Sequence, residues 1–499
     1  MKREIITLSL TLLMALGAVA QGSYTQQSGR LTLTEAIDYA HQNSASAKIA
    51  ELNFMSKYWD FRSFKAELLP ALNLSGDFGN FDRSVVEARD YVTGEINYVS
   101  NNTLSNDVTL SIDQQIALTG GTISLTSSLS RLDQFSYDAT TFQSNPVTIQ
   151  YTQPIRGFNT LKWQKRSEPL EYESAKRSYL ESMQTITINT TSYFFAVLTA
   201  QTSLRNNIQN SDDTRELYDI AKQRFEIGTI TKSELLQLEL SLLNAEISTN
   251  DSRIALETAL FNLKFYLGII DDRVLDLVPP TSIPQIAVTY DFVLERALEN
   301  STHDLSIAID RLAGEQTVAE AKANRGIQLS FRSNLGLSQT GNTFPAAYRR
   351  VQDQEVVGLS VSMPIFDWGM SKGKVKLAEA ELQLIETEIE QSEISYRQDI
   401  MIKVMEFNNL TRQCEASLRA VYVAGERYQI MKDRFTNGGV TVTDLNTAQE
   451  EMDDANDEYV SQLKSFWSAY YDLQKTSLYD FILKRDINAE FDRIIENQL

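Results

Sequence analysis

The chain has 499 residues, of which 42% are hydrophobic and 22% charged, and its formal net charge is −20. That charge balance disfavours nucleic acids as partners, because phosphate binding needs clustered positive charge. Cys414 is the only cysteine, so the chain has no internal disulfide. The only two histidines, His41 and His303, are far apart in the sequence, which argues against a histidine zinc site or a Ser-His-Asp triad. We therefore expect that the protein is not an enzyme and that it has no catalytic residues, no cofactor and no metal site.

The first twenty residues have the pattern of a secretory signal peptide. Lys2 and Arg3 precede an apolar run from Ile5 to about Val19, and small residues then offer a cleavage site before Gln21. An uncleaved membrane anchor is the alternative, but the run is short for a membrane span. Further along, no apolar stretch approaches the roughly 18–20 residues that a spanning helix needs. The mature chain is therefore expected to be periplasmic, secreted or inserted as a β-barrel.

Two segments of the chain repeat one sequence plan. YDIAKQRFEIGTITKSEL starts at Tyr218 and YQIMKDRFTNGGVTVTDL starts at Tyr428, and the two align without a gap at a spacing of 210 residues. Pro154-Ile155 and Pro364-Ile365 have the same spacing. A chance similarity would not keep the same spacing over both pairs of motifs, so the sequence predicts an internal two-fold repeat.

The starts of the two repeats are also similar. LTLTEAIDYAHQNS begins at Leu31 and VTYDFVLERALENS begins at Val288, at a spacing of 257 residues. The prolines between the repeats indicate a linker. The predicted organisation is a signal peptide over 1–20, a first repeat over 21–278, a linker over 279–287, a second repeat over 288–485 and a C-terminal tail over 486–499.

Each repeat is predicted to contain a helix, then strands, then a long helical hairpin. In the first repeat a helix over about 34–69 stops at Pro70, and alternating residues then indicate strands. From each Pro-Ile pair a helical pattern runs for roughly 65 residues, or about 100 Å, to Gly228 or Gly438. The returning helices are expected over about 232–267 and 443–483.

The first repeat carries additional residues between its first helix and its Pro-Ile pair. The two spacings differ by 47 residues. Alternation over 108–112 and 123–125, on either side of Gly120-Gly121, predicts an extra β-hairpin near 106–133. From the sequence alone, this hairpin either joins a barrel wall or projects from its rim.

These elements predict an assembly of several chains. A helix of about 100 Å cannot be buried in one globular core, so its apolar stripes must pack along neighbouring helices. A sheet of four strands, or six with the extra pair, leaves edges that are too costly in lipid, and three chains of four strands would give about twelve. The predicted fold is mainly α with a β-barrel part: long antiparallel helical hairpins form a periplasmic tunnel, joined to a trimeric transmembrane barrel.

Motifs over nearly the whole mature chain carry a family resemblance. They are LTLTEAIDYAHQNS, YTQPIRGF, SMPIFDWG, RFEIGTITKSELLQLE and RFTNGGVTVTDLNTAQ. They resemble the outer-membrane efflux (TolC-like) family. The resemblance implies a homotrimer with its barrel in the outer membrane and its helical tunnel in the periplasm. It also implies a periplasmic adaptor protein and an inner-membrane transporter as partners.

The leading hypothesis is therefore a passive exit duct for the efflux of small molecules in a tripartite pump. Its energy would come from the inner-membrane transporter, because the chain has no GxxxxGK[ST] phosphate loop. The exit duct of a type I protein secretion system is an alternative within the family. A periplasmic adaptor or structural coiled-coil protein is the alternative of another class, and an enzyme of the cell envelope is the third. Two equal repeats that each return to strands argue against the adaptor.

The resemblance implies that the two turns are periplasmic tips at which the adaptor docks. The tip residues are Gly228, Thr229, Ile230 and Thr231 in the first turn, and Gly438, Gly439, Val440 and Thr441 in the second. The alternative is that these are simply good turns, since glycine permits the positive φ that ends one helix and threonine caps the next.

Two acids follow the tips at equivalent positions. Asp444 matches an acidic position that lines the closed end of the tunnel in this family, and Glu234 is its counterpart in the first repeat. Three symmetry copies would form a cation-selective pore constriction. The alternative for both acids is a charge that complements a helix N-terminus.

The second tip departs from the pattern of some family members. Those members hold the tunnel shut with a tyrosine and an arginine, where this chain has Phe435 and Val440. The contacts that close this tunnel must therefore differ, and the nearest cationic candidates are Lys432 and Arg434.

Overall fold

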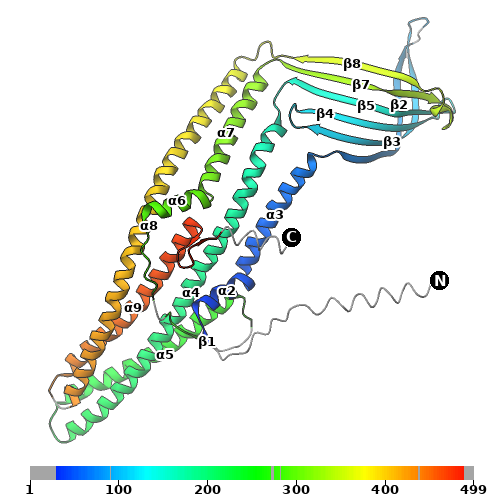
Figure 1. Ribbon diagram of the computed structural model, residues 1–499. Coiled ribbons are helices and arrows are strands. Elements are labelled where there is room, and N and C mark those ends of the chain that lie inside the picture. Colours follow the sequence, from blue (N-terminus) through cyan, green and yellow to red (C-terminus); the bar gives the residue numbers. More distant parts are fainter. Residues whose placement is uncertain (1–29, 90–91, 271–274, 281–282, 437–438, 488–499) are drawn as a thin grey trace, which may run out of the picture. The chain divides into compact units, whose positions relative to one another are not determined.

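The structure is a computed structural model that describes residues 30–89, 92–270, 275–280, 283–436 and 439–487 (Figure 1). The predicted signal peptide, residues 1–20, and residues 488–499 of the predicted tail lie outside the described residues. Among the described residues, no helix combines the length and the apolar character needed to cross a membrane.

The chain divides into two compact units. The first, which we call the tip unit, contains the described residues within 30–45, 187–284 and 412–467. The second, the sheet unit, contains the described residues within 46–186, 285–411 and 468–487. Two long helices, α4 (Thr160–Glu226) and α8 (Met370–Thr436), contribute residues to both units.

The sheet unit is built on one six-stranded sheet in which every strand is antiparallel to its neighbours. Its order is β2-β3-β4-β5-β7-β8 (Figure 1). The strands are β2 (Ala71–Arg89), β3 (Ile96–Ile116), β4 (Gly121–Gln134), β5 (Ala139–Arg156), β7 (Gln328–Gly341) and β8 (Gln352–Ser362).

The extra hairpin of the first repeat lies inside this sheet. Its strands β3 and β4 pair along Thr103–Ile116 and Gly121–Gln134, and together they separate β2 from β5. Gly120 makes the turn with a φ of +72°, a conformation that glycine adopts without steric cost. The paired part of the hairpin extends slightly beyond the predicted range 106–133, to Thr103 and Gln134.

The helices of the two halves have equal lengths. In the first half they are α2 (Leu33–Asn43), α3 (Ala45–Glu67), α4 and α5 (Lys232–Leu267), with 11, 23, 67 and 36 residues. In the second half they are α6 (Tyr290–Asn300), α7 (His303–Arg325), α8 and α9 (Val442–Ser477), again with 11, 23, 67 and 36 residues. The long helices that run from near each Pro-Ile pair were correctly predicted.

Two helices differ from their predicted bounds: one is interrupted, and the other ends early. The single helix predicted over 34–69 is interrupted at the buried Ser44, whose extended backbone (ψ 147°) ends α2 before α3 begins. The helix predicted to continue to about residue 483 ends at Ser477, since Leu478 has a φ of +46°. The side chain of Leu478 is buried against Phe54 and Leu180, and this packing compensates for the unusual backbone conformation.

Candidate functional site

The first tip joins α4 to α5 through a glycine turn and a capped helix start. Gly228 has a φ of +78°, and the next amide, of Thr229, donates to the carbonyl of Arg224 at 2.9 Å, which closes the end of α4. Thr231 caps α5: its hydroxyl accepts from the amide of Glu234 at 3.2 Å, and its own amide donates to the Glu234 carboxylate at 2.8 Å. This is a complete capping box.

The second tip, between α8 and α9, shows matching hydrogen bonds in its described residues. Gly438 lies outside the described residues, and the amide of Gly439 donates to the carbonyl of Arg434 at 2.9 Å. The amide and hydroxyl of Thr441 donate to one oxygen of the Asp444 carboxylate at 3.1 and 2.7 Å, and the Asp444 amide donates back to the hydroxyl at 3.3 Å. The described residues of the two tips therefore share the same capping hydrogen bonds.

Both candidate pore acids are exposed and ionised. Hydrogen bonds from the amide and then the hydroxyl of Thr231 hold the pKa of Glu234 below its ordinary value. Hydrogen bonds from the hydroxyl and then the amide of Thr441 do the same for Asp444. Each acid thus has a helix-capping role inside its own chain, and each keeps its negative charge at a helix N-terminus.

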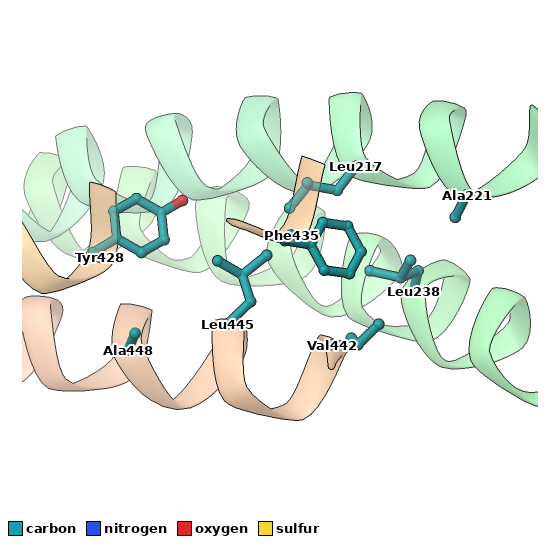
Figure 2. Close-up of a cluster of buried hydrophobic side chains, with 8 residues drawn as sticks. All are labelled: Leu217, Ala221, Leu238, Tyr428, Phe435, Val442, Leu445 and Ala448. Atoms are coloured by element: carbon teal, nitrogen blue, oxygen red, sulfur yellow. The ribbon is translucent and has the colours of Figure 1, made fainter. Parts of the chain in front are cut away.

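The apolar residues of the tips pack inward. Phe435 is only 6% exposed and lies among Leu217 and Leu238 of the first hairpin and Val442 and Leu445 of the second (Figure 2). The tip side chains Ile230 and Val440 pack against the same cluster. Phe435 therefore packs the two hairpins of one chain together. A tyrosine at this position would fit less well, because its buried hydroxyl would need a hydrogen-bond partner.

A polar cluster joins the two hairpins beside this apolar core. The carboxylate of Asp213, on α4, accepts from the Tyr428 hydroxyl at 2.8 Å and from the Lys432 ammonium at 2.6 Å, both on α8. Glu216 lies 3.6 Å from the same ammonium. Asp213 is 6% exposed, so the pair is largely removed from water. Lys432, a cationic candidate for closing the tunnel, is thus engaged within its own chain.

Sequence reasoning missed this cluster. Asp213 and Lys432 are 219 residues apart and belong to different repeats, so no local pattern relates them. The sequence singled out Lys432 only as a cation near the second tip, which does not point to its partner on α4.

Comparison with known proteins decides the family. The sequence model of the outer membrane efflux protein family matches residues 115–269 and 293–476, which together are more than half of the chain. The chain belongs to the outer membrane efflux protein family. Membership places this efflux protein in the outer membrane.

Individual relatives are distant in sequence and similar in fold. Outer membrane protein TolC of Escherichia coli (strain K12) is 23% identical over 365 residues, which are 68% of this chain and 72% of TolC. The CmeC outer membrane channel of Campylobacter jejuni is 16% identical with a TM-score of 0.66, over 92% of this chain and 88% of CmeC. The open-state MtrE outer membrane channel of Neisseria gonorrhoeae is 14% identical with a TM-score of 0.58, over 91% and 90% of the two chains. These structures share the TolC-like channel fold, mostly helical with a sheet.

A further acidic segment of this efflux protein escaped the sequence reasoning. Residues 450–458 of α9 read EEMDDANDE. Burial, and then the charges of Asp457 and Asp454, raise the pKa of Asp453 to about 6. One oxygen of the Asp453 carboxylate has no hydrogen-bond partner among the described residues. The run of acids was visible in the sequence, but which of them is half-buried was not.

Asp453→Asn is expected to stabilise the protein at pH 7.5 and not at pH 4. The folded pKa of Asp453 lies above its unfolded value, so stability is lost as the pH rises from 3.8 to about 6, and the loss is complete above that pH. Asparagine avoids that cost, for a gain on the order of 1 kcal/mol at neutral pH. Thermal unfolding at both pH values measures it. The exposed neighbour provides the control, since Asp454→Asn should give a clearly smaller gain, and an equal gain at both pH values for Asp453→Asn would refute the assignment.

Proposed function

We propose that three copies of this protein form a passive exit duct for small molecules across the outer membrane. The sheets would close into a barrel, and the helical hairpins would form the tunnel on the periplasmic side. A periplasmic adaptor would dock at the tips, and an inner-membrane transporter would supply the energy. The duct conducts and performs no chemistry.

The observation that carries this proposal is the two-faced sheet. On one face a row of apolar side chains runs across five strands, through Leu72, Ile112, Leu125, Ile149 and Leu335. On the other face the matching row is Asn73, Ser111, Thr126, Thr148 and Gly336. The apolar row is 41–68% exposed in the single chain. One apolar face and one polar face are what a barrel wall between lipid and water requires.

The helices carry exposed apolar stripes that support association of the chains. On α5, within the tip unit, Leu236, Leu240, Leu243 and Ile247 follow each other at coiled-coil spacing and are each more than half exposed. The opposite face of α5 is buried at Leu238. In the sheet unit, α8 exposes Leu377, Leu384, Ile394, Met401 and Met405. Stripes of this kind mark seams with other helices, and the family supports three copies of the same chain.

We also propose that the two halves are copies of one unit. The equal lengths of the four helices in each half and the constant 210-residue spacing of the long hairpins support this. The signal peptide over 1–20 and the repeat boundaries at 279–287 belong to the same proposal.

The tips are proposed as the adaptor-docking surface. Gly228→Val is expected to impair export while trimers still form, because a β-branched residue is strained at a φ of +78° by about 1–2 kcal/mol. Nothing lies within 4 Å of the position where a Cβ would be added, so the strain is confined to the backbone of the turn. Gly228→Asn is the matched control, since asparagine tolerates this conformation. Full export by the valine variant in a strain lacking the native protein would contradict the docking assignment.

Asp444 is proposed to set the cation selectivity of the closed pore. Three copies of its carboxylate around one axis would bind multivalent cations, which would block conduction. Asp444→Asn should weaken block by a trivalent cation about tenfold or more, with little loss of trimer, because the amide oxygen can still cap α9. Single-channel recordings in planar bilayers measure it. Equal block in wild type and Asp444→Asn would show that the carboxylate serves only as a helix cap.

The same recordings test the function itself. Purified wild-type protein should insert and open discrete ion-conducting channels. If it binds bilayers without conducting, the duct proposal is wrong.

A further inference from the structure

The inserted hairpin β3–β4 has the face pattern of the strands around it. Leu110 and Ile112 of β3 and Ile123 and Leu125 of β4 lie on the apolar face. They are 41–44% exposed, and the neighbouring Ile149 of β5 is 45% exposed. The apolar face of the hairpin is therefore as exposed as that of β5, which does not belong to the inserted hairpin.

Its polar face is equally continuous. Asp113 of β3 pairs with Ser124 of β4, which pairs with Gln150 of β5, and Gln150 pairs with Asn334 of β7. A hairpin that projected from the rim would not need this register, because a one-residue slip would exchange its two faces without penalty in water.

The base of the hairpin is also tied to the rest of the sheet unit. The side-chain amide of Asn159, just before α4, donates to the carbonyl of Ala117 at 3.1 Å, and Gln153 donates to the carbonyl of Thr119 at 2.9 Å. Gln114 of β3 donates to the carbonyl of Leu68 at 2.9 Å, at the end of α3. The hairpin is thus held at the same level as the ends of the other strands.

We infer that each subunit contributes six strands to the barrel wall, so that three subunits close a barrel of eighteen strands. The inference rests on the proposed trimeric duct, and it differs from the twelve strands expected from four strands per chain. The edge strands are β2 and β8, and the partner of each would be the opposite edge of a second copy. Because six is an even number, β8 of one copy meets β2 of the next in antiparallel orientation, as the other pairs in the sheet are.

The consequence is a wide exit. With strands about 4.8 Å apart and tilted by about 40°, twelve strands give a backbone diameter of about 24 Å and eighteen give about 36 Å. The cross-section of the barrel is then about twofold larger, in the range of strand numbers at which porins enclose an open aqueous channel. The polar face of the sheet would line it, so the barrel would admit bulky hydrophilic solutes and leave size selection to the helical part.

Site-directed fluorescence tests whether the hairpin is in the wall. Single cysteines are placed in a Cys414→Ala background, where the native thiol is buried. Leu125→Cys and Ser124→Cys report on β4, and Leu335→Cys and Asn334→Cys report on β7 at the same two levels of the sheet. Each is labelled with an environment-sensitive dye in trimers reconstituted with brominated lipids.

The label at Leu125 should be quenched by brominated lipid as strongly as that at Leu335, and several-fold more than those at Ser124 and Asn334. Quenching at Leu125 no greater than at Ser124, with the β7 pair behaving as expected, would overturn the inference and leave the proposed duct standing. If the β7 pair also shows no difference, the membrane barrel itself is wrong.

A deletion provides the second measurement. Asp82 of β2 and Ala139 of β5 lie at the same level, because Thr103 pairs with Asp82 and with Gln134, and Gln134 pairs with Ala139. Replacing residues 83–138 by Asn-Gly would join β2 directly to β5 in a two-residue hairpin. Electron cryomicroscopy should count eighteen strands in wild-type trimers and twelve in the variant, with a barrel about 1.5-fold narrower. Twelve strands in the wild type would overturn the inference, whether or not the variant folds.

Discussion

Replacing both Leu243 and Ile247 with aspartate is expected to abolish the trimer and leave a folded monomer. Both side chains belong to the exposed stripe of α5, at 52% and 59% exposure in the single chain. Burying a leucine or isoleucine contributes about 1.5–3 kcal/mol, and the stripe would be buried three times in a trimer. With two aspartates in each seam, the favourable free energy of burial is lost, and association must instead bury unpaired charges, which is unfavourable. Size-exclusion chromatography with light scattering in detergent measures the effect.

The matched control places the same charge beside the stripe. Ser248 is exposed and follows Ile247 on α5, but it points to a different side of the helix. Ser248→Asp should leave the trimer intact. If the double variant remains trimeric, α5 does not form a seam between subunits.

Lys432→Met is expected to cost about 3 kcal/mol of folding stability. The substitution leaves the Asp213 carboxylate buried, with the Tyr428 hydroxyl as its remaining partner on α8. Breaking one side of a buried ion pair typically costs about 3–5 kcal/mol, and the tyrosine reduces that penalty. Denaturant unfolding in detergent, followed by the loss of helical signal, measures it, and hydrogen exchange should locate the loosening in α8.

A double-mutant cycle separates pairing from packing. Asp213→Asn with Lys432→Met removes both charges and should recover a large part of the lost stability. Burial alone would lower the pKa of Lys432, but the hydrogen bond and charge of Asp213 outweigh it and raise that pKa. The pairing therefore stabilises the fold at neutral pH, and the contribution of the lysine charge is lost as the pH rises through the raised pKa. Wild-type stability in the single variant would show that the pair contributes nothing.

The sequence predicted the helical part of this fold closely. The spacing of 210 residues between the two tip motifs also separates the starts and ends of α4 and α8, and of α5 and α9. This worked because long helices are determined by local periodicity and by glycine and threonine at their ends. Thr231 and Thr441 were correctly predicted as caps.

The sheet and the polar contacts could be predicted only in part. Alternation revealed the extra hairpin, but its place between β2 and β5 depends on pairing between distant segments, which alternation does not encode. For the same reason the bond between Asp213 and Lys432 was invisible. Phe435 was read as a departure from a closing contact, whereas its burial gives it a packing role within one chain.

The proposed duct requires this chain to function as a trimer in the outer membrane. The most direct measurement is the mass of the protein extracted from purified outer-membrane fractions, determined by native mass spectrometry in detergent. The full sequence has a mass of 56.4 kDa, so removal of the predicted signal peptide leaves a slightly lighter subunit. We predict a particle of three such subunits that keeps its helical circular dichroism. A stable monomer with the same circular dichroism would contradict the account.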